Sequence, residues 1–118
     1  MWDFDDKGEE DVIAALKEVQ RRFKLAQIFL LNTGLEGYYH AYCFKVFDWA
    51  DTLKILASTE GIDKVFFKIG VIREYFTLRY SPKKARDFEP AIILPSRYKE
   101  DVNPYEVCSF VKYWTKRI

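Results

Sequence analysis

Two aspartates stand near the start of the chain, in the stretch WDFDDKG, with one residue between them. Because side chains alternate along a β-strand, a strand here would place Asp3 and Asp5 on the same face. Two neighbouring carboxylates repel each other unless a cation lies between them, and Mg²⁺ and Mn²⁺ prefer such hard oxygen ligands. The spacing therefore predicts a candidate site for a divalent metal. The alternative is that Asp5 or Asp6 caps a helix that begins near Glu9 and that the other carboxylates are solvated.

Further polar residues along the chain are candidates for binding or catalysis. The only histidine, His40, follows a glycine-containing turn in GYYHAY, where it is either a structural hydrogen-bonding group or a catalytic one. Asp63, in GIDKVFFKIG, has a simple structural explanation at the start of an expected strand. Arg73 and Arg79 would share one face of a regular strand that leads into Lys83. This face is a candidate anion-binding strip, unless each arginine pairs with an acidic residue across the sheet.

The hydrophobic pattern of the first half predicts a helix followed by a hairpin. Residues 9–23 have apolar side chains at helical spacing, acidic residues in the first turn and basic residues in the last. AQIFLLN (26–32) and YYHAYCFKVF (38–47) are apolar and aromatic runs joined by TGLEG, which is typical of two strands and a turn. A very short strand precedes the helix and would carry the first two aspartates.

The second half predicts another helix, two more strands and a last helix. DWADTLKILASTEG (48–61) has Asp48 placed as a cap and a glycine past its end. KVFFKIG (64–70) and REYFTLRYS (73–81) are two extended runs, followed by the basic, proline-bounded loop PKKARDFEP. NPYEVCSFVKYWTKR (103–117) has an asparagine cap and a proline at the first helical position.

This order predicts one α+β domain over residues 1–118, with a mostly antiparallel sheet backed by helices. The plan is close to an RNA-recognition or ferredoxin-like core with a C-terminal helix. Hydrophobic residues make up 49% and charged residues 31%, which favours an ordered globular chain. A net charge of +1 excludes a whole-molecule basic surface, so any nucleic-acid site would be local.

The sequence also predicts a protein of the cytoplasm that does not cross a membrane. No apolar run reaches the roughly eighteen residues of a membrane span, and no basic leader precedes an apolar segment. Cys43 and Cys108 lack the spacing of metal ligands, so we expect free thiols in a reducing compartment.

The order of the motifs resembles the archaeo-eukaryotic primase superfamily, the primase-polymerases. In that family an apolar strand ends in two alternating aspartates, and a helix follows it. A hairpin then carries a small residue and a histidine, and a third acidic residue and an arginine-rich strand come after it. WDFDD, TGLEGYYHAY, GID and REYFTLRYSPK are similar to these motifs in that order and cover roughly residues 2–84.

The resemblance implies a nucleotidyltransferase that uses nucleoside triphosphates on single-stranded DNA or a primer-template, with a replication protein as a further partner. It implies Mg²⁺ or Mn²⁺ held by Asp3, Asp5 and Asp63 at a catalytic site. His40 would contact the phosphates of the incoming nucleotide. The triphosphate or the backbone of the template would be bound by Arg73, Arg79 and Lys83.

Three other classes compete with this interpretation. A non-catalytic single-strand-binding or replication-accessory module on the same fold would use the basic strip, Lys84 and the tyrosines Tyr38, Tyr39, Tyr42 and Tyr75, and its binding would not need metal. A rolling-circle endonuclease would need two histidines for its metal, and the single histidine argues against it. A protein-interaction domain would use exposed aromatic residues at its interface.

Overall fold

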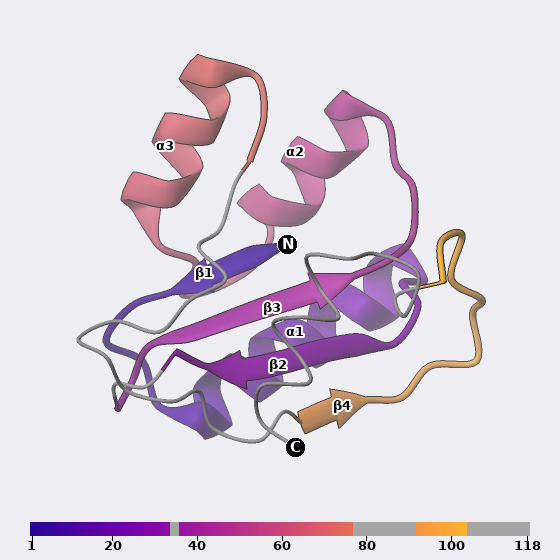
Figure 1. Ribbon diagram of the computed structural model, residues 1–118, viewed down its shortest axis with the longest axis horizontal. Helices are drawn as coiled ribbons and strands as arrows, with labels where there is room; N and C mark the ends of the chain where they lie inside the picture. The colour runs from indigo at the N-terminus through magenta and orange to yellow at the C-terminus, as the bar shows by residue number, and fades with distance from the viewer. Residues whose placement is uncertain (34–35, 77–91, 104–118) are drawn as a thin grey trace.

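Four strands and three helices make up the described part of this computed structural model, which comprises residues 1–33, 36–76 and 92–103. Their order is β1 (Trp2–Phe4), α1 (Glu9–Phe23), β2 (Ile28–Asn32), β3 (Tyr39–Cys43), α2 (Trp49–Ala57), α3 (Lys64–Arg73) and β4 (Ile92–Leu94). The strands form one sheet in the order β1-β3-β2-β4, and all neighbours are antiparallel (Figure 1). The predicted α+β class is confirmed. The predicted C-terminal helix after Asn103 and residues 77–81 of the predicted second hairpin lie outside the described residues.

Helix α1 covers one face of the sheet (Figure 1). Val12, Leu16 and Val19 are buried, as their helical spacing predicts, and belong to the same core cluster as Phe4 and Leu30 of the sheet. Burial of each such side chain contributes roughly 1.5–3 kcal/mol. This packing holds the helix against the sheet.

The start of α1 decides one of the alternatives left open above. Its N-cap is Gly8, and no side chain caps it. Asp6 instead has a left-handed backbone, with φ 56°, in the turn that follows β1. The interpretation of Asp5 or Asp6 as a helix cap is therefore wrong, and Asp3 lies in a strand.

β1, α1 and β2 form a split β-α-β unit, because β3 lies between the two strands and runs antiparallel to both. β4 pairs with β2 at the far edge. Among the described residues β1 therefore has a single strand neighbour, and α2 and α3 lie beyond its other side (Figure 1). The edge of β1 that does not pair with β3 thus faces the segment that connects α2 to α3.

The predicted strand at KVFFKIG is wrong, because this segment is helix α3. Its apolar residues surround the helix on all sides, so they have no helical periodicity, and aromatic and β-branched residues favour strands. The helix is capped by Asp63, whose Oδ2 accepts a hydrogen bond from the amide of Phe66 at 2.8 Å. Arg73 ends this helix, so it cannot share a strand face with Arg79; Arg79 and Lys83 lie outside the described residues.

A glycine inside α3 makes room for an aromatic ring. The ring of Phe76 lies against Phe66, Phe67 and Trp49, with ring centroids 5.2, 6.2 and 5.4 Å away. A Cβ atom at Gly70 would overlap the same ring. The helix therefore carries glycine in its interior, despite a propensity cost of roughly 1 kcal/mol.

Two other predictions concern single features. Within the described residues, no helix is both long and apolar enough to span a membrane. Cys43 is a half-buried free thiol, and burial raises the pKa of this thiol.

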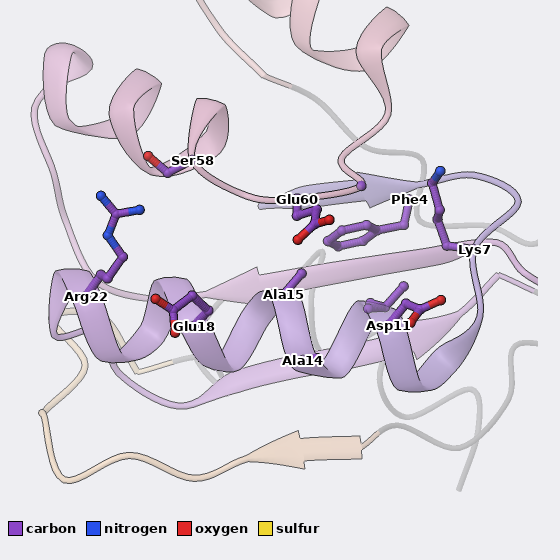
Figure 2. Close-up of a pocket in the computed structure, with 11 residues that line it drawn as sticks. Phe4, Lys7, Asp11, Ala14, Ala15, Glu18, Arg22, Ser58 and Glu60 are labelled. Carbon is purple, nitrogen blue, oxygen red and sulfur yellow. The ribbon is translucent and has the colours of Figure 1, made fainter.

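A hollow of about 690 Å³ lies between α1 and the connection from α2 to α3 (Figure 2). Its walls carry charges of both signs, from Asp11, Glu18, Arg22 and Glu60, around the small residues Ala14 and Ala15. None of the predicted metal ligands lines it. This mixed surface does not favour one ligand class.

Candidate metal centre

The register of the sheet places the first aspartate beside the histidine. Asp3 of β1 is the cross-strand partner of His40 in β3, and His40 is the partner of Leu31 in β2. Cross-strand partners project from the same face of a sheet, so these three side chains form one row. Asp5 follows two residues after Asp3, just past the end of β1. The two aspartates that the alternation predicted to share a face thus lie at the open edge of the sheet.

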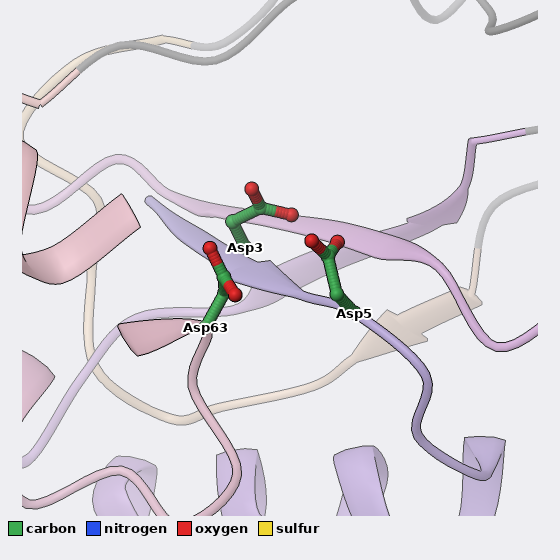
Figure 3. A group of neighbouring side chains, drawn as sticks. All are labelled: Asp3, Asp5 and Asp63. Carbon is green, nitrogen blue, oxygen red and sulfur yellow. The ribbon is translucent and has the colours of Figure 1, made fainter. Parts of the chain in front are cut away.

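The third aspartate reaches this edge through a backbone contact. The amide of Asp63 donates a hydrogen bond to the carbonyl of Asp3 at 2.7 Å, so the connection from α2 to α3 runs beside β1. One carboxylate oxygen from each of Asp3, Asp5 and Asp63 lies within 4.8 Å of the other two. Figure 3 shows the three carboxylates converging. We call these residues the aspartate triad.

The donor set of the triad suits Mg²⁺ or Mn²⁺. All three residues are half-buried and offer hard oxygen ligands. Two oxygens on opposite sides of an octahedral Mg²⁺ are about 4.2 Å apart, since each metal–oxygen distance is about 2.1 Å. The carboxylate oxygens of the triad lie within 4.8 Å of one another, which is close to this spacing. The three carboxylates therefore fit a shared divalent ion, or two ions bridged between them.

His40 belongs to this centre through Asp3. It is only 5% exposed, and its Nε2 lies 3.6 Å from Oδ1 of Asp3, which is longer than a hydrogen bond. An imidazole at this distance partly offsets the carboxylate charge when it is protonated. The histidine thus supports the aspartate from the neighbouring strand.

Two hollows adjoin the triad and share Asp63. The first has a volume of about 630 Å³ and is lined by Asp5 and by three lysines, Lys7, Lys64 and Lys68. The second, of about 240 Å³, is lined by Asp3, Arg73, Tyr75 and apolar residues of α3. Of the predicted phosphate-binding residues, the structure brings Arg73 to the centre.

Lys64 and Lys68 were not among the site residues predicted from the sequence, and the fold explains why. Lys64 and Lys68 are four residues apart, so their side chains are neighbours on one face of a helix, whereas in a strand the same spacing would separate them by about 13 Å. The segment between them was predicted as a strand, in which this spacing carries no special meaning for a site. Recognition of Asp63 as a helix cap would have supplied the signal.

The four tyrosines expected to stack on bases have different environments. Tyr39 is 7% exposed and belongs to the core, so it is not available to contact a single strand as that class of protein would require. Tyr38 and Tyr42 are half-buried. Tyr75 is 53% exposed and lines the hollow with Arg73. Tyr75 is the tyrosine best placed to contact a ligand at the triad.

Comparison of the chain with protein-family models, with curated proteins and with solved structures found no match.

Proposed function

We propose that this chain is a metal-dependent nucleotidyltransferase domain of the primase-polymerase type, acting with nucleoside triphosphates on single-stranded DNA or a primer-template. The observation that carries the proposal is the aspartate triad, in which Asp63 is far from Asp3 and Asp5 in sequence, yet all three residues present carboxylate oxygens within 4.8 Å of one another. The motif order that resembles primase-polymerases supports it, because the three aspartates of the two acidic motifs, WDFDD and GID, are the ones that meet.

The residues around the triad have the chemistry that such a reaction needs. Mg²⁺ or Mn²⁺ ions, when bound, would polarise a phosphoryl oxygen and favour the ionised form of an attacking hydroxyl. Asp3, Asp5 and Asp63 would hold and orient them. Arg73, exposed at the end of α3 and lining a hollow with two of these aspartates, would neutralise charge on the phosphates.

A non-catalytic single-strand-binding module is the second candidate. Arg73 and the exposed ring of Tyr75 line the same hollow, and a cation beside an aromatic ring is typical of single-strand binding. Such a module would bind an oligonucleotide equally well with and without metal. Its affinity would fall with salt, because phosphate contacts release counterions.

Calorimetric titration with a nucleoside triphosphate, in Mn²⁺ and then in EDTA, tests the first proposal. We expect binding that requires Mn²⁺ and that Asp3→Asn abolishes. Asp51→Asn, in the first turn of α2, removes the same charge away from the triad and should bind as the wild type does. A metal-dependent enzyme would be contradicted if the wild type bound the nucleoside triphosphate equally well in Mn²⁺ and in EDTA. It would also be contradicted if Asp3→Asn and Asp51→Asn bound the nucleoside triphosphate with the same affinity. Primer-extension assays then separate catalysis from binding.

A further inference from the structure

The hollow beside Asp5 and Asp63 has a charge pattern that suggests its ligand. Among the residues that line it, the charged groups are these two aspartates and the three lysines Lys7, Lys64 and Lys68. Its remaining walls are small or apolar, from Ala57, Thr59, Gly61, Ile62 and Phe67. We call this space the lysine hollow.

The fold places the lysines from two directions. Lys7 follows the turn after β1, and its amide donates to the carbonyl of Gly37 at 2.9 Å. Its side chain lies over Gly61, where a Cβ atom would be 3.7 Å from Cδ and Cε of the lysine. Lys64 and Lys68 share one face of α3. The hollow therefore has cationic side chains from two segments, the turn after β1 and helix α3.

The lysines are not neutralised by the part of the protein that the structure describes. No carboxylate among the described residues forms an ion pair with Lys7, Lys64 or Lys68. Three ammonium groups against the two carboxylates of Asp5 and Asp63 give the lining an excess of positive charge, so an anion that enters beside the lysines is attracted to them. Lysine is a common phosphate ligand, since its ammonium acts as a point charge with three donors.

We propose that the lysine hollow binds the phosphate groups of the substrate. The inference rests on the proposed function, because the adjoining aspartates are the candidate metal ligands and Mg²⁺ is commonly held by carboxylates together with substrate phosphates. The volume of about 630 Å³ lies within the range of roughly 300–1,000 Å³ that is typical of ligand pockets. Two sources carry this chemistry, the triphosphate of a free nucleotide and the phosphodiesters of a single strand.

Two double variants with the same charge change test this inference. Lys64→Gln/Lys68→Gln removes two charges from the hollow. Lys17→Gln/Lys54→Gln removes two charges from exposed positions on α1 and α2 that do not line it. Because all four lysines are exposed, both variants should fold, and thermal melts monitored by circular dichroism check this.

The probes are inorganic tripolyphosphate, a nucleoside triphosphate, a nucleoside without phosphate and a single-stranded oligothymidylate, each titrated in EDTA and in Mn²⁺. We expect the variant in the hollow to bind phosphate-bearing probes about 10- to 100-fold more weakly than its control, which corresponds to one or two charge-assisted contacts. Lys7→Gln should weaken the same probes. Loss of tripolyphosphate binding assigns the hollow to the free nucleotide, whereas loss confined to the oligothymidylate assigns it to the strand.

A separate readout distinguishes this inference from the proposed function. Mn²⁺ binding without any phosphate, followed by the electron paramagnetic resonance signal of free Mn²⁺, reports on the triad alone. It should persist in the lysine variants and be lost in Asp63→Asn. If Mn²⁺ does not bind but the lysine variants still lose tripolyphosphate in EDTA, the enzyme proposal fails and the phosphate site stands. Equal affinities of hollow and control variants for every phosphate-bearing probe would overturn the phosphate site, whatever Mn²⁺ does.

Discussion

Substitution of Asp63 by asparagine separates the two tasks of this residue. Its carboxylate caps α3 and also contributes one of the three negative charges of the triad. Asparagine caps helices about as well as aspartate does. Asp63→Asn therefore removes the charge and keeps the cap, so we expect the metal-free protein to become more stable and Mn²⁺ to bind more weakly.

The expected gain in stability follows from the spacing of the carboxylates. Two unit charges 4.8 Å apart repel by about 3.5 kcal/mol at an effective dielectric constant of about 20. The three residues are only half-buried, so solvent screens this repulsion. We therefore expect a net stabilisation of roughly 1 kcal/mol in EDTA. Loss of one of three charged ligands should weaken Mn²⁺ binding by about 100-fold.

The chain contains a matched control for the helix cap. Asp48 caps α2 with the same geometry, since its Oδ1 accepts from the amide of Asp51 at 2.8 Å, and it lies outside the triad. Asp48→Asn should change neither stability nor Mn²⁺ affinity. Asp63→Ala loses the cap as well as the charge, so a cost of about 1 kcal/mol should cancel the gain.

Urea denaturation in EDTA and in Mn²⁺ measures both effects. At a Mn²⁺ concentration 100 times its dissociation constant, the wild type should gain about 2.7 kcal/mol from binding to the native state. Asp63→Asn should gain much less at the same concentration. Asp63 would be no more than a helix cap if Asp63→Asn left the free energy of unfolding unchanged in EDTA, if Asp63→Ala lost about 1 kcal/mol there, and if both variants responded to Mn²⁺ like the wild type.

Two further substitutions test the packing that holds the centre. The buried indole N–H of Trp2 donates a hydrogen bond to the hydroxyl of Thr59 at 2.9 Å. Thr59→Val removes this acceptor, so the free energy of unfolding measured in urea titrations should fall by about 1–3 kcal/mol. Thr59→Ser keeps a hydroxyl and should lose clearly less stability. Gly70→Ala should destabilise by about 1–3 kcal/mol, despite the higher helix propensity of alanine, because the new methyl group displaces the ring of Phe76. An unchanged or raised midpoint of unfolding for Gly70→Ala would contradict this packing.

The elements with a clear period could be predicted from the sequence. The helix over residues 9–23 has the bounds of α1, since its apolar spacing, acidic first turn and basic last turn all agree. The alternation of Asp3 and Asp5 likewise predicted a strand with both carboxylates on one face. The hairpin of β2 and β3 follows from two apolar runs and a turn that contains Gly37, which has φ 84°.

The segment of α3 and the position of the third aspartate could not be predicted in the same way. An apolar run on all sides of a helix has no period, so its state is decided by packing against α2 and by the Asp63 cap. The sequence gives no local signal that Asp63 meets Asp3, because that contact is a hydrogen bond between distant parts of the backbone. Only the resemblance to primase-polymerases suggested it.

Three long-range hydrogen bonds explain why the centre forms at so short a strand. β1 has three residues, and its ladder with β3 is its only strand pairing within the described chain. Trp2 donates to Thr59 at the end of α2, and the carbonyl of Asp3 accepts from Asp63. Lys7 donates to Gly37 in the turn before β3. Because these bonds lie before, within and after the pair of aspartates, the contacts that hold β1 in the fold also fix the separation of the carboxylates, and a metal ion that joins them would in turn stabilise β1.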